Sequence, residues 1–166
     1  MDEIPEPNAP PGAGLPLPEL MIVRVFYRLR RLTGNRETFN KLFSSERSTI
    51  GSLVESCEPQ SRAKRVLIQR VRSFEDSSRY WSVLMTLDHQ RIVNQSITGL
   101  IGALSKGKTP PGKASTAAVK PNLKTKARYN HPWFGSMDAS GWHATAAHHL
   151  GIHRVQIERI LSGLAG

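Results

Sequence analysis

Residues Trp142–Ile160, WHATAAHHLGIHRVQIERI, have the clearest periodicity in the chain and predict one long amphipathic helix. One face of this helix carries the residues that a bundle would bury, namely Trp142, Ala146, His149, Ile152, His153, Gln156 and Ile160. His149 and His153 are four residues apart, so their side chains lean the same way from successive turns and can share one metal ion. This stretch therefore predicts a buried helix face that contains a metal-binding pair.

A third histidine is predicted to point toward the same core from a second long helix. Ser77 or Ser78 can cap a helix that begins near Tyr80 and ends at about Ser105. At about 100° per residue, a narrow face of this helix carries His89 together with apolar side chains. Its members are Met85, His89, Val93, Leu100 and Leu104. His89 is therefore the candidate third ligand.

Three imidazoles, from His89, His149 and His153, would form a ligand set that leaves other positions open to water or substrate. Imidazole suits zinc, nickel, copper or iron(II), and zinc or nickel is the divalent ion that we expect. Such an ion lowers the pKa of bound water or holds a thiol as its thiolate, which predicts hydrolysis or thiol transfer. Gln156, Asn94 and backbone carbonyls are candidate acceptors for the other ring nitrogens.

The alternative is that these histidines are core residues without a metal. An inward histidine is more often hydrogen-bonded than metal-bound, and His89 alone would favour that interpretation. Burial of His149 and His153 one turn apart without a shared partner is costly, which favours the metal site. The alternative predicts a non-catalytic bundle that acts in assembly or in a stress response.

The other histidines are predicted to lie outside the ligand set. His148 and His143 are rotated from His149 by about 100° and 120° on the helix, which makes them peripheral. His131 lies in the HPWFG segment, where it serves either as a proton shuttle or as a turn residue beside Pro132.

Composition limits the class of protein. With 166 residues, 39% of them hydrophobic, the chain can bury one core, and we expect a single domain over residues 18–166. A net charge of +10 favours acidic small molecules, nucleic acid or anionic surfaces as neighbours. Cys57 is the single cysteine, so an internal disulfide and a CxxC motif are excluded, and a cytoplasmic location is expected. No apolar run approaches the roughly 20 residues of a membrane span, so no membrane partner is expected.

The N-terminal half predicts an arm and two helices. Residues 1–17 contain five of the eleven prolines and predict an extended, disordered arm. Residues 18–34 predict a basic amphipathic helix, and we expect it to pack on the core with its arginines in solvent rather than to lie on a membrane or a partner helix. Residues from about 37 to 56 predict a second helix, and residues 58–76 an irregular connector around the strand-like VLIQRV.

A long basic loop is predicted at about residues 106–130. No acidic residue lies between His89 and Met137, whereas eight lysines and arginines do. Such a loop is either simply solvated, or a lip that attracts anions to a site, or a non-specific nucleic-acid contact. The loop lacks interleaved aromatic residues and any recognised binding motif, so nucleic acid is not the partner that we expect. HPWFG then predicts an aromatic turn before the last helix, which Ser136, Asp138 or Ser140 can cap.

Two blocks of sequence resemble the DinB-like superfamily, in particular a bacterial branch of DinB-related proteins. They are SSRYWSVLMTLDHQRIVN around His89 and HPWFGSMDASGWHATAAHHLGIHRVQIERI around His149 and His153. The resemblance implies an all-α, up-down-down-up four-helix bundle. It also implies a divalent metal held by one histidine of the second helix and two histidines of an HxxxH motif on the last helix. These positions fall on His89, His149 and His153.

The resemblance further implies a metal-dependent enzyme that acts on a small molecule, with a low-molecular-weight thiol such as mycothiol, bacillithiol or glutathione as co-substrate. This chain departs from the family in one respect. Only about ten residues, 121–130, separate the basic loop from the HPWFG turn, so the third helix of the bundle is expected to be shortened or missing. The helix from Pro18, or a second subunit in a homodimer, can cover the exposed face. The third alternative is that the chain is a decayed or inactive member of the family.

Overall fold

The computed structural model describes residues 14–109 and 126–165, and most of these residues are helical. The long helices of the described residues are α1 (Leu17–Thr33), α2 (Arg36–Ser56), α3 (Val83–Ser105) and α4 (Ala139–Ala165). The shorter elements are two 3-10 turns (Pro59–Ser61 and Asp76–Ser78) and the strands β1 (Val66–Leu67), β2 (Tyr80–Trp81), β3 (Tyr129–His131) and β4 (Gly135–Met137). The predicted all-α class is confirmed.

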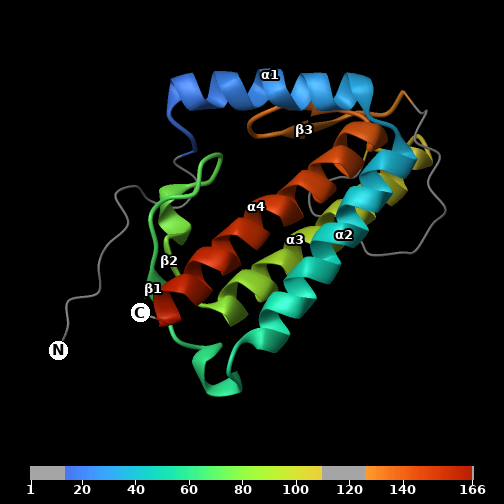
Figure 1. Cartoon of the computed structure of the whole chain (residues 1–166). Coiled ribbons are helices and arrows are strands. Elements are labelled where there is room, and N and C mark those ends of the chain that lie inside the picture. The colour runs from blue at the N-terminus through green and yellow to red at the C-terminus, as the bar shows by residue number, and fades with distance from the viewer. Residues whose placement is uncertain (1–13, 110–125, 166) are drawn as a thin grey trace.

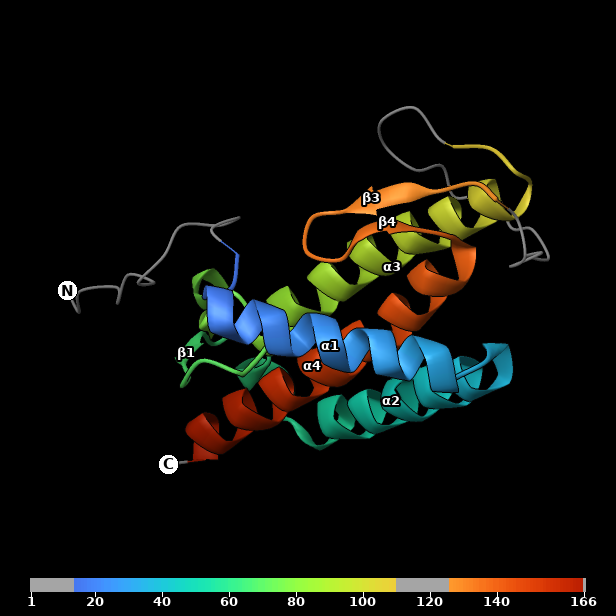
Figure 2. The same cartoon turned by 90° about the horizontal axis from the view of Figure 1, so that it is seen from above.

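Helix α4 is the central element of the fold. Helices α2 and α3 pack along opposite sides of it, and α1 crosses over its outer surface (Figure 1). Seen from above, α1 lies over α4, and the β3–β4 hairpin lies beside α1 (Figure 2). Different side chains of α4 therefore face α1, α2 and α3.

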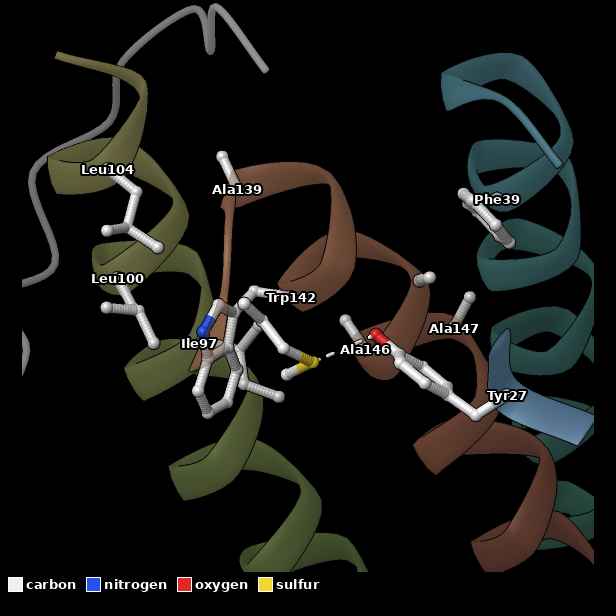
Figure 3. Close-up of a cluster of buried hydrophobic side chains, with 11 residues drawn as sticks. Tyr27, Phe39, Ile97, Leu100, Leu104, Ala139, Trp142, Ala146 and Ala147 are labelled. Carbon is white, nitrogen blue, oxygen red and sulfur yellow. Dashed lines mark hydrogen bonds between the residues drawn. The ribbon is translucent and has the colours of Figure 1, made fainter. Parts of the chain in front are cut away.

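The core follows from the small side chains along α4. Its first half is rich in buried alanines, which allow neighbouring helices to approach closely, and its second half buries Ile157 and Ile160 completely. In the cluster at the first half, Leu100 and Leu104 of α3 lie near Trp142 of α4 (Figure 3). None of the helices in the described residues is both long and apolar enough to cross a membrane.

Helix α3 begins later than the sequence predicts. Its N-cap is Ser82, whose hydroxyl accepts a hydrogen bond from the Met85 amide at 3.2 Å, and neither Ser77 nor Ser78 caps it. Tyr80–Trp81 is not helical because it pairs as antiparallel strand β2 with Val66–Leu67, the start of the VLIQRV segment. The strand-like connector is thus confirmed, and the start of the helix at Tyr80 is wrong.

The second strand pair forms around the predicted aromatic turn. Tyr129 pairs with Met137 and His131 with Gly135, so that the turn joins two short antiparallel strands. Tyr129–Asn130 therefore belongs to β3 and not to the predicted basic loop. Asp138, one of the candidate caps, accepts a hydrogen bond from the Gly141 amide at 2.8 Å at the start of α4. Residues 1–13 of the predicted arm and 110–125 of the basic loop lie outside the described residues.

Helix α1 begins at Leu17, one residue earlier than predicted, and packs differently from the prediction. Tyr27 is its one buried residue, while several of its large apolar side chains are exposed. Two of its arginines contact the protein instead of solvent alone: Arg24 donates to the Trp133 carbonyl, and Arg31 forms an ion pair with Asp138. The expectation that this helix buries its apolar residues on the core is therefore wrong for most of α1, whereas Arg24, Arg28 and Arg30 are exposed as expected.

Candidate metal centre

The structure brings the three predicted histidines together. His89 comes from α3, and His149 and His153 come from successive turns of α4. One ring nitrogen of each can be chosen so that all lie within 4.8 Å of one another. The ring centroids are 4.4 Å apart for His149 and His153, 4.8 Å for His89 and His153, and 5.4 Å for His89 and His149. The two faces inferred from helical periodicity therefore meet at one point.

The closest contact in this cluster joins the Nε2 atoms of His149 and His153, which are 3.1 Å apart. Two imidazole nitrogens that bind one zinc ion at about 2.0–2.1 Å each lie roughly 3 Å apart. The same distance fits an N–H···N hydrogen bond between two neutral rings. The two Nε2 atoms are thus spaced to bind one metal ion between them. Without a metal ion, a single proton can bridge them in a hydrogen bond.

Gln156 sets the tautomer of His153. Its side-chain oxygen lies 2.8 Å from His153 Nδ1, and its amide nitrogen donates to the Ser78 carbonyl at 2.9 Å. Because the Ser78 carbonyl fixes the orientation of the amide, the Gln156 oxygen faces the ring and Nδ1 must carry the proton. The lone pair of His153 Nε2 is consequently directed at the other two histidines, as a metal ligand requires.

Aromatic side chains enclose the cluster. Trp81 packs against His89 with ring centroids 5.2 Å apart and stacks parallel to His153 at 6.5 Å. Phe74 meets the edge of His153 at 4.9 Å. Reasoning from the sequence missed both residues: Phe74 lies in the irregular connector, where no periodicity assigns a side chain to a face, and Trp81 lies in β2 although the sequence predicts helix there. Their rings reduce the access of water to the histidines.

Burial keeps the imidazoles neutral. The pKa of His149 is lowered from 6.5 to about 2, chiefly by burial and then by the neighbouring His153, His89 and His131. Burial lowers the pKa of His153 to about 4 against the opposing effect of the Gln156 hydrogen bond, and it also lowers the pKa of His89. A neutral imidazole is the form that binds a metal, so the cluster needs no deprotonation at neutral pH.

A pocket of about 430 Å³ lies beside His149, between α1 and α4. Its wall includes Ile22 and Phe26 of α1 and the ion pair between Glu46 and Arg154, whose atoms are 2.6 Å apart. The Nδ1 atom of His149 is buried and has no hydrogen-bond partner among the described residues. The second ring nitrogen of this histidine is thus unpaired and closed to solvent among the described residues.

His131 lines the same pocket from the β3–β4 turn. Its Nδ1 accepts hydrogen bonds from the amides of Trp133 at 3.0 Å and Phe134 at 3.4 Å, so that Nε2 carries the proton. Burial lowers its pKa to about 4. His131 therefore ends β3 just before the turn and lines the pocket that contains His149, and its role as a proton shuttle stays a prediction.

The remaining candidates lie apart from the cluster. His143 Nε2 lies 2.9 Å from Asn40 Oδ1, and His148 packs against the Phe39 ring. Asn94 lines a separate pocket with Leu150 and does not contact the histidines, so it is not the acceptor that was considered. It faces α2 from α3, at a different angle from His89.

Comparisons of the chain with protein-family models, with curated protein sequences and with solved structures give no match. The DinB-like resemblance therefore rests on the two sequence blocks that contain His89, His149 and His153.

Proposed function

We propose that the chain is a DinB-like protein that binds one divalent metal ion through His89, His149 and His153. In this proposal the protein is an enzyme that uses the ion to catalyse thiol transfer or hydrolysis. The observation that carries this proposal is the 3.1 Å separation of the His149 and His153 Nε2 atoms beside His89. Gln156 supports it, because metal-bound histidines generally donate their other ring N–H to an oxygen acceptor, and the Gln156 oxygen takes that position at His153.

The donor set fits zinc or nickel. All three ligands are nitrogen donors held neutral by burial, and imidazole is a ligand that both ions accept. When bound by three imidazoles, such an ion lowers the pKa of water or of a thiol, which is the chemistry that hydrolysis and thiol transfer need.

The residues around the cluster supply the remaining functions. Gln156 holds the proton of His153 at Nδ1, while Trp81 and Phe74 limit the entry of water. The pocket beside His149 is large enough for a small organic molecule, including one bound next to a low-molecular-weight thiol. In this proposal the third helix is shortened or missing, and α1 takes its place and forms one wall of the pocket.

Elemental analysis of protein purified without a histidine tag tests the metal site. We expect about one zinc or nickel ion per chain in the wild type and loss of that ion in His89→Ala and in His149→Ala. His148→Ala is the matched control, because it removes an imidazole from the adjacent position of the same helix and should retain the metal.

The enzymatic part of the proposal needs a separate measurement. Metal-loaded protein is to be screened with thiol-transfer and hydrolysis substrates, and the turnover that is found should disappear in His153→Ala. Wild-type protein that stays metal-free after incubation with divalent ions would overturn the metal site. Full activity of His153→Ala would overturn the role of the metal in catalysis.

A further inference from the structure

The outward face of α1 is apolar along its whole length. Helix α1 is the outermost helix of the fold and runs across the top of the view in Figure 1. Seven large apolar side chains of this helix are each between 52 and 83% exposed. They are Leu17, Met21, Ile22, Val25, Phe26, Leu29 and Leu32, which we call the outer face.

Most of the outer face points away from the protein, while its edge at Ile22 and Phe26 borders the pocket beside His149. At about 100° per residue, its members spread over roughly half of the helix circumference, on the side opposite to Tyr27. Tyr27 points toward α4 (Figure 3). Its hydroxyl donates to the Gly141 carbonyl and lies 3.0 Å from Thr145 Oγ1. A soluble helix normally has the reverse arrangement, with its polar half in solvent. Something apolar is therefore expected to cover this face.

The charges on α1 are almost all positive. The helix carries Arg24, Arg28, Arg30 and Arg31, and Glu19 is its one acidic residue. Glu19 is already engaged, because it forms an ion pair with Arg70 and accepts a hydrogen bond from the Ser73 amide at 2.6 Å.

The acidic neighbour of the helix is engaged as well. Asp138 forms ion pairs with both Arg31 and Arg128, at 2.8 and 3.0 Å, so the local charge stays positive. Arg28 has no ion-pair partner among the described residues, and the Arg30 guanidinium lies over the Phe26 ring. A partner of α1 must therefore accept apolar side chains and supply negative charge.

We propose that α1 binds the surface of an anionic lipid bilayer, with its outer face in the interfacial region and its arginines at the lipid phosphates. An apolar face flanked by arginines is the pattern of helices that lie in a membrane interface. A second copy of the chain fits less well, because two α1 helices face to face would bring eight arginines together without a free acidic group. The proposal does not depend on the metal site.

The position of α1 links this surface to the pocket beside His149. Ile22 and Phe26 belong to the outer face and also line that pocket, so one helix borders both the proposed lipid surface and the candidate site. A molecule that enters the pocket past α1 would therefore come from the membrane side.

Vesicle co-sedimentation of the full chain tests the proposal. The wild type should bind vesicles that contain both phosphatidylglycerol and phosphatidylcholine, but not vesicles of phosphatidylcholine alone. Salt should release the bound protein, because the attraction is partly electrostatic. The triple variant Met21→Gln, Val25→Gln, Leu29→Gln should lose at least about tenfold in partitioning, since it removes apolar groups that would enter the interface. Arg28→Gln should lose about fivefold, the effect of one arginine near an anionic surface.

Matched controls exist on the other helices. Ile92→Gln on α3 replaces an exposed apolar residue, and Arg47→Gln on α2 replaces an exposed arginine, so neither should alter vesicle binding. The substituted α1 residues are exposed, and unchanged thermal unfolding of the triple variant would show that it folds.

Three results would overturn the proposal. The first is no binding of the wild type to anionic vesicles at about 0.1 M salt, where surface charges still interact over roughly 10 Å. The second is undiminished binding of the triple variant. The third is a wild-type dimer, detected by analytical ultracentrifugation, that does not form in the triple variant, together with no binding to vesicles. That result would mean that a second copy of the chain covers the outer face.

Discussion

Gln156 is the residue on which the orientation of the candidate site depends. Gln156→Leu keeps the size of the side chain but leaves both His153 Nδ1 and the Ser78 carbonyl without their buried partner. We expect a loss of about 1–3 kcal/mol in the free energy of unfolding from the unpaired groups. Metal affinity should fall roughly 10- to 100-fold because the ring is no longer held. Urea unfolding and a zinc competition titration measure the two effects.

A second buried glutamine provides the control. Gln90 lies on α3, and its side-chain nitrogen is buried without a hydrogen-bond partner among the described residues. Gln90→Leu removes an unpaired donor instead of a bonded one, so unfolding and metal affinity should stay the same or improve slightly. Equal losses in Gln90→Leu and Gln156→Leu would show that Gln156 acts through general packing and not through His153.

The pKa values of the histidines predict how many protons a metal ion displaces. At pH 6.5 an imidazole of ordinary pKa is about half protonated, so three such ligands would release roughly 1.5 protons on binding. The pKa values of His149 and His153 are lowered to about 2 and about 4, and that of His89 is also lowered. These rings are already neutral, and we expect far fewer than 1.5 protons per zinc. Calorimetry in buffers of different ionisation enthalpy counts the protons, and a value near 1.5 would contradict the burial of these rings.

At the scale of single elements, the start of α3 gives a direct test of the fold. Ser82 caps the helix and is nearly completely buried, so Ser82→Ala should cost about 1 kcal/mol in the free energy of unfolding. Ser77, which the sequence equally suggested as a cap, lies in the preceding 3-10 turn. Ser77→Ala should change the free energy by less than about 0.5 kcal/mol. Denaturant unfolding of the two variants compares the positions, and the opposite order would place the helix start near Tyr80.

The same element shows what the sequence can and cannot predict. A helix of many turns repeats its pattern, so α3 and the face that carries His89 were predicted from residue spacing. A strand of two residues has no period, and the sequence predicts helix at Tyr80–Trp81 because nothing in the residue spacing shows that they pair with Val66–Leu67. For the same reason Trp81 was missed as a neighbour of the histidines. Gln156 was named as one of two side-chain acceptors, but only the packing of α4 against the Ser78 segment distinguishes it from Asn94.

At the scale of the whole molecule, the sequence predicted that helices pack but not which way each faces. Periodicity shows that α1 has an apolar side, yet it does not say whether that side meets the core. The core along α4 is already filled by α2 and α3, which leaves α1 a shallow surface that one large side chain, Tyr27, occupies. Helix α1 is therefore held mainly by that residue and by the polar contacts of Glu19, Arg24 and Arg31.

This mode of attachment predicts that α1 detaches more readily than the rest of the fold. Local opening is easiest where few apolar contacts are buried, and α1 buries one residue, whereas α4 buries twelve. Hydrogen exchange measured by mass spectrometry should show faster exchange in α1 than in α3 and α4. Tyr27→Leu deletes the hydroxyl that donates to the Gly141 carbonyl, a hydrogen bond that contributes about 1 kcal/mol. Hydrogen exchange in α1 should therefore become at least about fivefold faster, while exchange in α3 and α4 should stay unchanged. Val25→Leu, at an exposed position of the same helix, is the control and should have no effect. Faster exchange across α3 and α4 in Tyr27→Leu would mean instead that α1 unfolds together with the whole molecule.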